Sequence, residues 1–262
     1  MLTQHFFLMQ LSVIIITKNV SSDIRFCLES VKWADEIIVL DSGSTDDTCK
    51  ICSEYTTKIF STDWPGFGVQ KNRVLSKAQG KWILSIDADE VLSEALISEI
   101  KQIVFNTKIY HDAYSIKRIS YFCGKKMLHG DWGNDRVVRL FRNHKKIQFS
   151  AVPVHEKVIN YCHLGHLKHF IYHKTIKSIS QMLIKLDNYA TYGAQRAYQQ
   201  GKKSSVLKAA FCGLWCFIRG YFLYFGFLDG KEGFILAVSN ANGVFYRWIK
   251  LLYLHAMQSK GE

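Results

Sequence analysis

The feature that most limits the fold is an alternation of short apolar runs with helical patterns over the first hundred residues. The segments Ser12–Thr17, Glu36–Leu40 and Trp82–Ile86 are nearly continuous apolar runs rich in Val and Ile. Strands that are covered on both faces of a parallel sheet have this composition. We therefore predict an α/β fold with a doubly wound, mostly parallel sheet flanked by helices.

Between these runs, apolar residues at helical spacing follow residues that can cap a helix. Ile24, Leu28 and Val31 share one helical face after Ser21 and Ser22. Similar patterns predict helices over residues 46–55 and 68–78, with a further strand over 58–61. After a helix at about 93–105, the pattern changes to strands over 113–121 and 137–141.

Amphipathic helices dominate the C-terminal third. Apolar positions step by three or four residues through Ile176–Gln200 and again through Phe234–His255. We predict a nucleotide-sugar-binding and catalytic domain over residues 1–175 and a helical, basic and aromatic extension over 176–262. A chain of 262 residues with 48% hydrophobic residues can bury a sizeable core.

The net charge of +12 is concentrated near the C-terminus. Residues 163–262 contain thirteen Lys and Arg against four Asp and Glu, whereas residues 1–162 contain twenty-one against eighteen. Such a surface suits nucleic acid, anionic lipid headgroups or a phosphorylated substrate. The odd count of seven cysteines favours reduced thiols in the cytoplasm, and Cys49 and Cys52 are interpreted as two thiols of one helix.

Two apolar runs, Ala209–Ile218 and Tyr221–Leu228, are separated by Arg219 and Gly220. Together they fall short of a clean span of roughly 20 uncharged residues. A segment in the membrane interface, or a core helix, fits them better. The nearby cations and aromatic residues predict peripheral attachment to an anionic membrane surface; they are Lys202, Lys203, Lys208, Arg219, Trp215, Phe217 and Tyr221.

Polar side chains stand where the predicted parallel strands end. Thr17 and Asn19 follow the first strand, Asp41 ends the second, and Asp87-Ala-Asp-Glu90 follows the fourth. In an open parallel sheet these ends share one edge, and ligands bind in the crevice outside it. Three separated pieces of sequence therefore converge on one predicted site.

Asp87 and Asp89 place two carboxylates on the same side of an extended segment. Hard oxygen ligands of this kind suit Mg²⁺ or Mn²⁺. A metal there can neutralise the charge that develops on a departing nucleoside diphosphate. The alternative interpretation is a solvated turn before a helix that Ser93 caps.

Other nucleotide and metal motifs are missing from the sequence. It has neither a Gly-x-Gly-x-x-Gly nor a Gly-x-x-x-x-Gly-Lys-Ser/Thr motif. Lys71 or Arg73 could meet a phosphate at a helix N-terminal turn. His155-Glu156 is not a zinc-binding helix motif, because position 159 is Ile. The spacing of His163, His166, His169 and His173 allows a metal cluster on a helix, but we expect ordinary hydrogen-bonded histidines.

Several of these segments resemble the inverting family-2 glycosyltransferases of the GT-A fold, within them the lipopolysaccharide-core enzymes of the WaaE/KdtX type. The resemblance covers nearly the whole chain and extends through Val154-His-Glu156 and Gly226-Phe-Leu-Asp-Gly230. Its main motifs are Ser12-Val-Ile-Ile-Ile-Thr-Lys-Asn19, Trp33-Ala-Asp-Glu-Ile-Ile-Val-Leu-Asp41-Ser-Gly-Ser-Thr-Asp46, Trp64-Pro-Gly-Phe-Gly-Val-Gln-Lys-Asn72 and Ile86-Asp-Ala-Asp-Glu90.

The resemblance implies a role for each of these residues. Thr17 and Asn19 would line the base pocket, and Asp41 would contact the uracil or ribose of a UDP-sugar. Asp87 would lie near the ribose and diphosphate, with Lys71 on the donor side. Asp89 would bind the divalent cation, and His155 would lie near the diphosphate or the metal. Val20 and Ser21 stand where relatives usually carry glutamates, which puts an acidic contact to the base there in doubt.

An inverting transfer also needs a base that deprotonates the attacking hydroxyl. The family's Trp-x-x-Asp-x-x-x-Arg-Leu-Phe-Arg pattern matches Trp132 through Arg142 and makes Asp135 the expected base. Asp131 is its competitor, and a merely polar loop is the third interpretation.

The resulting hypothesis is transfer of a hexose, such as glucose, from a UDP-sugar to the lipopolysaccharide inner core, at the inner face of a bacterial membrane. Alternatives are a transferase acting on polyprenyl phosphate, another glycan or a peptide. A basic nucleic-acid-binding α/β protein is the alternative of another class. We expect no nucleic-acid partner, because no recognisable binding module is present.

Overall fold

The computed structural model describes residues 9–106, 110–150 and 156–258. The strands are β1 (Leu11–Thr17), β2 (Glu36–Asp41), β3 (Ile59–Ser61), β4 (Trp82–Ser85), β5 (Glu90–Leu92), β6 (Ala113–Phe122), β7 (Lys125–Lys126), β8 (Arg136–Arg142), β9 (Gln148–Phe149), β10 (Val158–Ile159) and β11 (Leu164–Ile176). The helices are α1 (Ser21–Val31), α2 (Thr48–Ser53), α3 (Phe67–Leu75), α4 (Glu94–Phe105), α5 (Ile179–Gln199), α6 (Val206–Ile218) and α7 (Gly230–Gln258). Short 3-10 segments cover Gly130–Trp132 (η1) and Gly226–Asp229 (η3), and a π-helical turn covers Arg219–Leu223 (η2).

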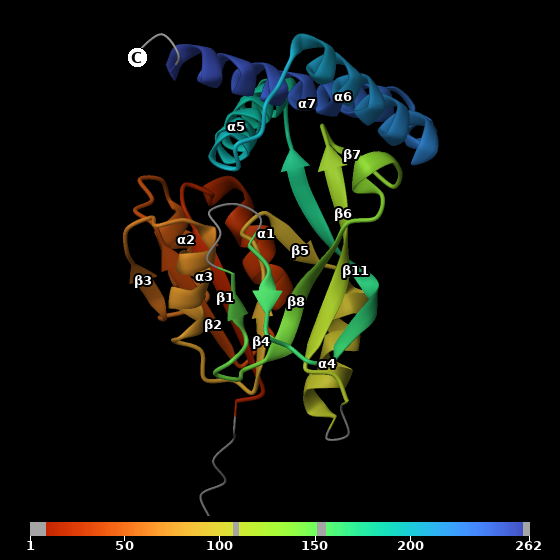
Figure 1. Ribbon diagram of the computed structural model, residues 1–262. Helices are drawn as coiled ribbons and strands as arrows, with labels where there is room; N and C mark the ends of the chain where they lie inside the picture. The colour runs from red at the N-terminus through yellow and green to blue at the C-terminus, as the bar shows by residue number, and fades with distance from the viewer. Residues whose placement is uncertain (1–8, 107–109, 151–155, 259–262) are drawn as a thin grey trace, which may run out of the picture. The chain divides into compact units, whose positions relative to one another are not determined.

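One mixed sheet organises the N-terminal part of the chain (Figure 1). Its strand order is β3-β2-β1-β4-β8-β6-β11-β5, and β7 pairs with β6 at one end. The first four strands in this order are parallel, so their carboxyl ends lie along one edge. Beyond β4 the pairing becomes antiparallel, beginning with β8. The α/β prediction is confirmed, with the parallel part confined to four strands.

Helices cover both faces of the parallel part, as the doubly wound pattern requires. On one face α1, α2 and α4 bury residues such as Leu28 and Ile100 against Val13, Val39 and Leu84. On the other face α3 and the β9–β10 hairpin pack on the alternate side chains of the same strands. Because successive strand residues point to opposite faces, a strand covered on both sides must be apolar throughout.

Five strands were not foreseen from the sequence, namely β5, β7, β9, β10 and β11. β5 is only three residues long, and β11 contains the histidines at 166, 169 and 173 that were spaced as if on a helix. The alternative of a metal cluster on a helix is therefore excluded for these three histidines. The imidazole of His166 instead lies 2.6 Å from the hydroxyl of Ser115.

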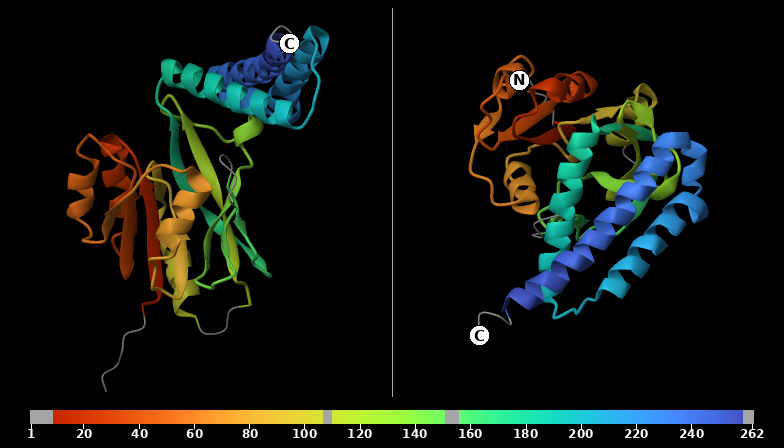
Figure 2. Two further views of the ribbon diagram at one scale, coloured as in Figure 1. Left: turned by 60° about the vertical axis from the view of Figure 1, so that its left-hand side comes forward. Right: turned by 90° about the horizontal axis from the view of Figure 1, so that it is seen from above.

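The chain divides into two compact units. Unit 1 comprises residues 1–118 and 136–173, and unit 2 comprises residues 119–135 and 174–262. In unit 2, α7 packs against both α5 and α6 (Figure 2). A predicted boundary after residue 175 stays a prediction, but the C-terminal helical extension is present.

Core packing on α1 can be tested with two residues of the same helix. Leu28 is fully buried, whereas Phe26 is 55% exposed. We expect Leu28→Ala to lower the free energy of unfolding by about 2–5 kcal/mol, because the removed atoms leave a cavity under the sheet. Phe26→Ala should change it by less than about 0.5 kcal/mol. Urea unfolding measures both, and similar losses for the two variants would contradict this packing.

Candidate active site

A buried carboxylate ends β2. Asp41 is 2% exposed, and its Oδ1 accepts a hydrogen bond of 2.9 Å from the hydroxyl of Thr17 at the end of β1. Its Oδ2 accepts from the backbone N–H groups of Gly43 and Ser44 at 2.9 and 2.7 Å. Burial acts to raise the pKa of Asp41, but the hydrogen bonds from Ser44 and Thr17 outweigh it and hold the pKa below its usual value.

The loops after β1 and β2 are tied together by side-chain hydrogen bonds. The Asn19 side chain accepts from the backbone N–H of Thr45 at 2.8 Å, and the Asn19 N–H donates to the Ser44 hydroxyl at 2.8 Å. Asp46 accepts from the N–H of Ser21 at 3.1 Å. Asn19 itself has φ of 51°, a left-handed conformation that asparagine tolerates better than most residues. Thr17, Asn19 and Asp41 are thus brought together, as predicted from the strand ends.

Asp87, just beyond β4, is held between two cations. The ammonium of Lys71 on α3 lies 2.9 Å from its Oδ1, and Arg139 on β8 binds its Oδ2. Lys71 and Arg139 are both buried. Burial acts to raise the pKa of Asp87, but the charges of Arg139 and Lys71 outweigh it and hold the pKa far below its usual range.

Two more carboxylates complete this network of charges. Lys71 also pairs with Glu156 at 2.6 Å. Glu90, fully buried at the start of β5, pairs with Arg139 at 2.6 Å and with Arg118 at 3.2 Å. Each buried charge therefore has at least one opposite partner, as buried ions require.

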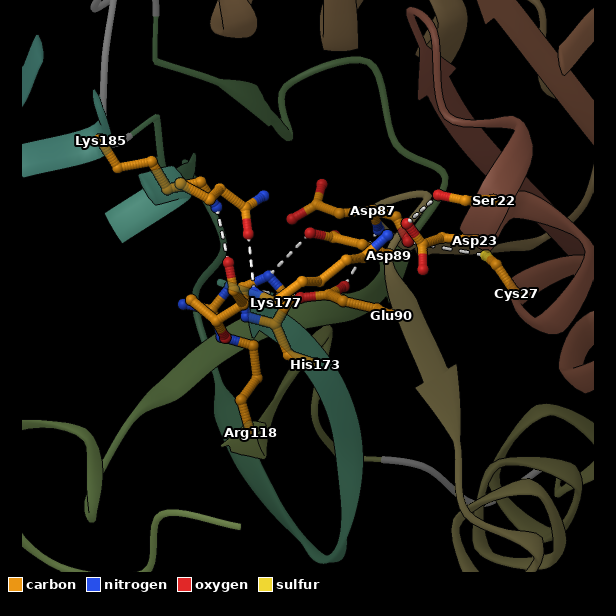
Figure 3. Close-up of polar contacts among 12 residues, drawn as sticks. Ser22, Asp23, Cys27, Asp87, Asp89, Glu90, Arg118, His173, Lys177 and Lys185 are labelled. Atoms are coloured by element: carbon orange, nitrogen blue, oxygen red, sulfur yellow. Dashed lines mark hydrogen bonds and ion pairs between the residues drawn. The ribbon is translucent and has the colours of Figure 1, made fainter. Parts of the chain in front are cut away.

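Asp89 points to a different partner (Figure 3). Its Oδ2 lies 3.2 Å from Nε2 of His173 on β11. The antiparallel register that pairs Glu90 with His173 brings them together. Burial acts to lower the pKa of His173, but the hydrogen bond and charge of Asp89 outweigh it and raise the pKa. About a third of the Asp89 side chain remains exposed.

Within the described residues, no group of three or more His, Cys, Asp and Glu is arranged to hold a metal ion. Asp89 and His173 supply two groups with ligand chemistry. His155, predicted near the metal, lies outside the described residues. Arg73, the alternative phosphate ligand on α3, instead binds Asp63 at 2.6 Å and Thr62 at 3.0 Å.

The two candidate bases differ in their surroundings. In unit 2, Asp131 pairs with Arg219 at 2.8 Å, and its second oxygen accepts from the Asn240 amide at 3.1 Å. Asp135 is half-buried and immediately precedes β8.

A sequence model described as "Glycosyl transferase family 2" matches residues 12–162, which contain β1 through the β9–β10 hairpin and the carboxylates described above.

The chain belongs to glycosyltransferase family 2.

Two bacterial glycosyltransferases and one solved structure are similar to this family-2 glycosyltransferase along most of its length. An uncharacterized glycosyltransferase of Rickettsia prowazekii is 32% identical, with 97% of this chain and 89% of the relative aligned. The lipopolysaccharide core biosynthesis glycosyltransferase LpsC of Rhizobium meliloti is 26% identical, with 95% of this chain and 94% of LpsC aligned. The crystal structure of S. aureus TarS 1-349 in complex with UDP-GlcNAc has a TM-score of 0.48 at 15% identity, over 97% of this chain and 93% of that chain.

Membership of family 2 confirms the resemblance seen in the sequence and the GT-A assignment of the α/β fold. It also decides between the enzyme and the nucleic-acid-binding protein in favour of a glycosyltransferase. Sequence reasoning missed the ion pair between Arg139 and Asp87. Its signal is present in the sequence as a lone cation inside the apolar run Val137-Val-Arg-Leu-Phe141.

The hydrogen bonds to Asp41 predict a pH-dependent effect of Asp41→Asn. At pH 7 we expect the free energy of unfolding to fall by about 1–3 kcal/mol, because an amide cannot accept from all the donors around it. The pKa of Asp41 is lower in the folded than in the unfolded state, where it is about 3.9. The stabilisation is therefore present above that pH and is lost as the pH falls through the folded pKa.

Denaturant unfolding at pH 7 and at decreasing pH below about 3.9 measures this difference. Asp63→Asn, at an exposed site, serves as the control and should change stability by less than about 0.5 kcal/mol. A deficit of Asp41→Asn that stays constant on acidification would contradict the assignment.

Proposed function

We propose that this enzyme is an inverting, metal-dependent glycosyltransferase that moves a hexose, such as glucose, from a UDP-sugar to the inner core of lipopolysaccharide. The observation that carries the proposal is the meeting of Thr17, Asp41 and Asp87 at one edge of the sheet. In open α/β sheets, that edge is where nucleotides bind.

The donor half of the site has acceptors and donors suited to a nucleoside diphosphate. Asp41 offers a buried carboxylate for the uracil or ribose, with Thr17 and Asn19 beside it. Lys71 is the buried cation next to Asp87, and its ammonium can turn toward a diphosphate that arrives at the strand ends. A phosphate would replace carboxylate partners of Lys71 with an anion of higher charge.

A divalent cation, Mn²⁺ or Mg²⁺, fits Asp89 better than Asp87. Both oxygens of Asp87 face cations, whereas the Asp89 carboxylate lies beside an imidazole, a group that can itself bind a metal. Magnesium in particular is often held by one or two carboxylates together with substrate phosphates and water. When bound, the metal supplies charge neutralisation for the departing diphosphate.

For the base we favour Asp135. β8 runs antiparallel to β4, with Leu140 opposite Leu84, so β8 begins at the edge where β4 ends. Asp135 directly precedes that beginning, and it stands at the Asp of the family's Trp-x-x-Asp-x-x-x-Arg-Leu-Phe-Arg pattern. In the proposed step, the acceptor oxygen bonds to the anomeric carbon, the bond to UDP breaks, and the hydroxyl proton passes to Asp135.

The acceptor and the location rest on the likeness to LpsC, whose name assigns it to lipopolysaccharide core biosynthesis. A lipid-linked acceptor would place the enzyme at the inner face of the bacterial inner membrane. An acceptor profile that compares inner-core lipopolysaccharide with polyprenyl phosphate tests this part separately from donor use.

Titration calorimetry of UDP and UDP-sugars, with and without Mn²⁺, tests the donor site. We expect Mn²⁺ to strengthen UDP binding to the wild type. In the presence of Mn²⁺, Asp89→Asn should raise the Kd for UDP by about tenfold or more. The control variant Asp63→Asn changes an exposed carboxylate and should keep the effect of Mn²⁺ on UDP binding. Equal Mn²⁺ dependence in the wild type and Asp89→Asn would remove Asp89 from the metal site.

Asp135→Asn should abolish transfer while UDP binding stays near that of the wild type, because an amide cannot take the hydroxyl proton. We expect a loss of at least about a hundredfold in kcat. Asp131→Asn is the matched variant and should retain most of the transfer. An active Asp135→Asn enzyme beside an inactive Asp131→Asn enzyme that still binds UDP would assign the base to Asp131.

A further inference from the structure

The α6 helix is apolar on all sides, yet most of it is exposed. Between Val206 and Leu223 the only charged residues are Lys208 and Arg219, and 22% of this segment is buried. Leu207 and Phe211 are 72% and 71% exposed. A helix that is hydrophobic all round is normally buried in protein or lipid.

Only one face of α6 is used by the fold of unit 2. Ala209, Gly213 and Cys216 are buried on that face. A Cβ atom at Gly213 would lie 3.2 Å from the carbonyl oxygen of Ala241 and 3.3 Å from Phe245, both on α7. This close packing accounts for the small residues of α6 and leaves the large ones on its other side without protein cover among the described residues.

The exposed apolar surface continues into the turn between α6 and α7. The rings of Phe217, Tyr221 and Phe234 pack on one another, with centroids of neighbouring rings 5.4 to 5.9 Å apart. Four consecutive exposed apolar or aromatic side chains, at residues 222–225, would favour aggregation in water unless another surface covers them. The exposed side chains of this turn are Phe222, Leu223, Tyr224, Phe225, Phe227 and Leu228.

Charge favours an anionic cover for this surface. Residues 201–228 contain four basic residues and no acidic one. Three of the four, Lys202, Lys203 and Lys208, are exposed at or just before the start of α6. Trp215 and Tyr224 are exposed along the same segment. Cations and amphipathic aromatic rings beside an apolar face are typical of helices that lie in the headgroup region.

Length favours a helix that lies in the interface over one that crosses the bilayer. α6 and the π-helical turn η2 that continues it, Val206–Leu223, have 18 residues and are apolar enough to be a candidate membrane span. At the usual rise they reach only about 27 Å, whereas the hydrocarbon core is about 30 Å thick. The packed face of α6 is also held by α7, which contains Lys231, Arg247 and Lys250.

We propose that α6 and the following turn, residues 206–228, embed in the interfacial layer of an anionic bilayer, with Lys202, Lys203 and Lys208 at the phosphate groups. This inference stands on unit 2 alone and does not depend on the proposed donor or acceptor. The proposed partner of this apolar surface is a lipid bilayer, and a second copy of the chain is the competing partner.

The first test is co-sedimentation of the full chain with phosphatidylcholine vesicles that contain or lack phosphatidylglycerol. We expect tighter binding to the anionic vesicles. The triple variant Phe211→Ser, Phe222→Ser, Phe225→Ser should bind them at least about tenfold more weakly. Phe26, Phe105 and Tyr192 are also exposed but lie outside this segment. A control triple variant that changes them to Ser should bind the vesicles like the wild type.

UDP calorimetry on both triple variants reports folding of the donor site, so a failure of membrane binding is distinguishable from a failure of the proposed transferase. Equal binding to the two vesicle types, or equal losses in the two triple variants, would overturn the proposal. So would a wild-type dimer that the first triple variant converts to monomer with no change in vesicle binding.

Tryptophan fluorescence adds a measure of depth. Trp215 is 57% exposed on α6, so lipids brominated near the headgroup should quench its emission. Trp215→Phe should remove that quenching while vesicle binding persists. Stronger quenching of Trp215 by lipids brominated at the chain ends would contradict an interfacial position.

Discussion

The ion pairs around Asp87 are the interaction on which the candidate site depends. They join α3 through Lys71, the end of β4 through Asp87, β8 through Arg139 and β5 through Glu90. Losing one partner would leave an uncompensated charge in a buried setting, which costs far more than an exposed pair contributes. The network therefore fixes the edge of the sheet at the point where the parallel strands give way to antiparallel ones.

The two aspartates of one short motif have different protein partners. Both oxygens of Asp87 pair with Lys71 and Arg139, whereas Asp89 lies beside His173. Asp41 likewise has protein partners, since it accepts hydrogen bonds from the backbone of the loop after β2. In our proposal, a nucleoside diphosphate and its divalent cation bind beside these carboxylates and complete the site.

Unit 2 is built on another principle. Its helices are joined by close contacts between small residues, and a Cβ atom at Gly233 would fall within 1.9 Å of the Gly226 carbonyl oxygen. Small residues on the packed side concentrate the bulky ones on the other, which is how α6 comes to expose an apolar surface. The strand part of the enzyme instead buries its bulky residues on both faces of the sheet.

The sequence alone determined the parallel strands, most helices and the meeting of Thr17, Asn19 and Asp41, because period and strand ends are local properties. It also marked Asp87 and Asp89, and the family resemblance assigned Asp87 to the ribose and diphosphate and Asp89 to the metal. Only the tertiary structure revealed their protein partners, because Arg139 and His173 lie on strands that are 52 and 84 residues away. The pairing of β5 with β11 joins strands that are distant in the sequence. A strand of three residues, such as β5, is too short to be predicted from its residue pattern. The sequence also could not show which side of α6 is exposed. The packing against α7 shows which of its apolar sides is buried.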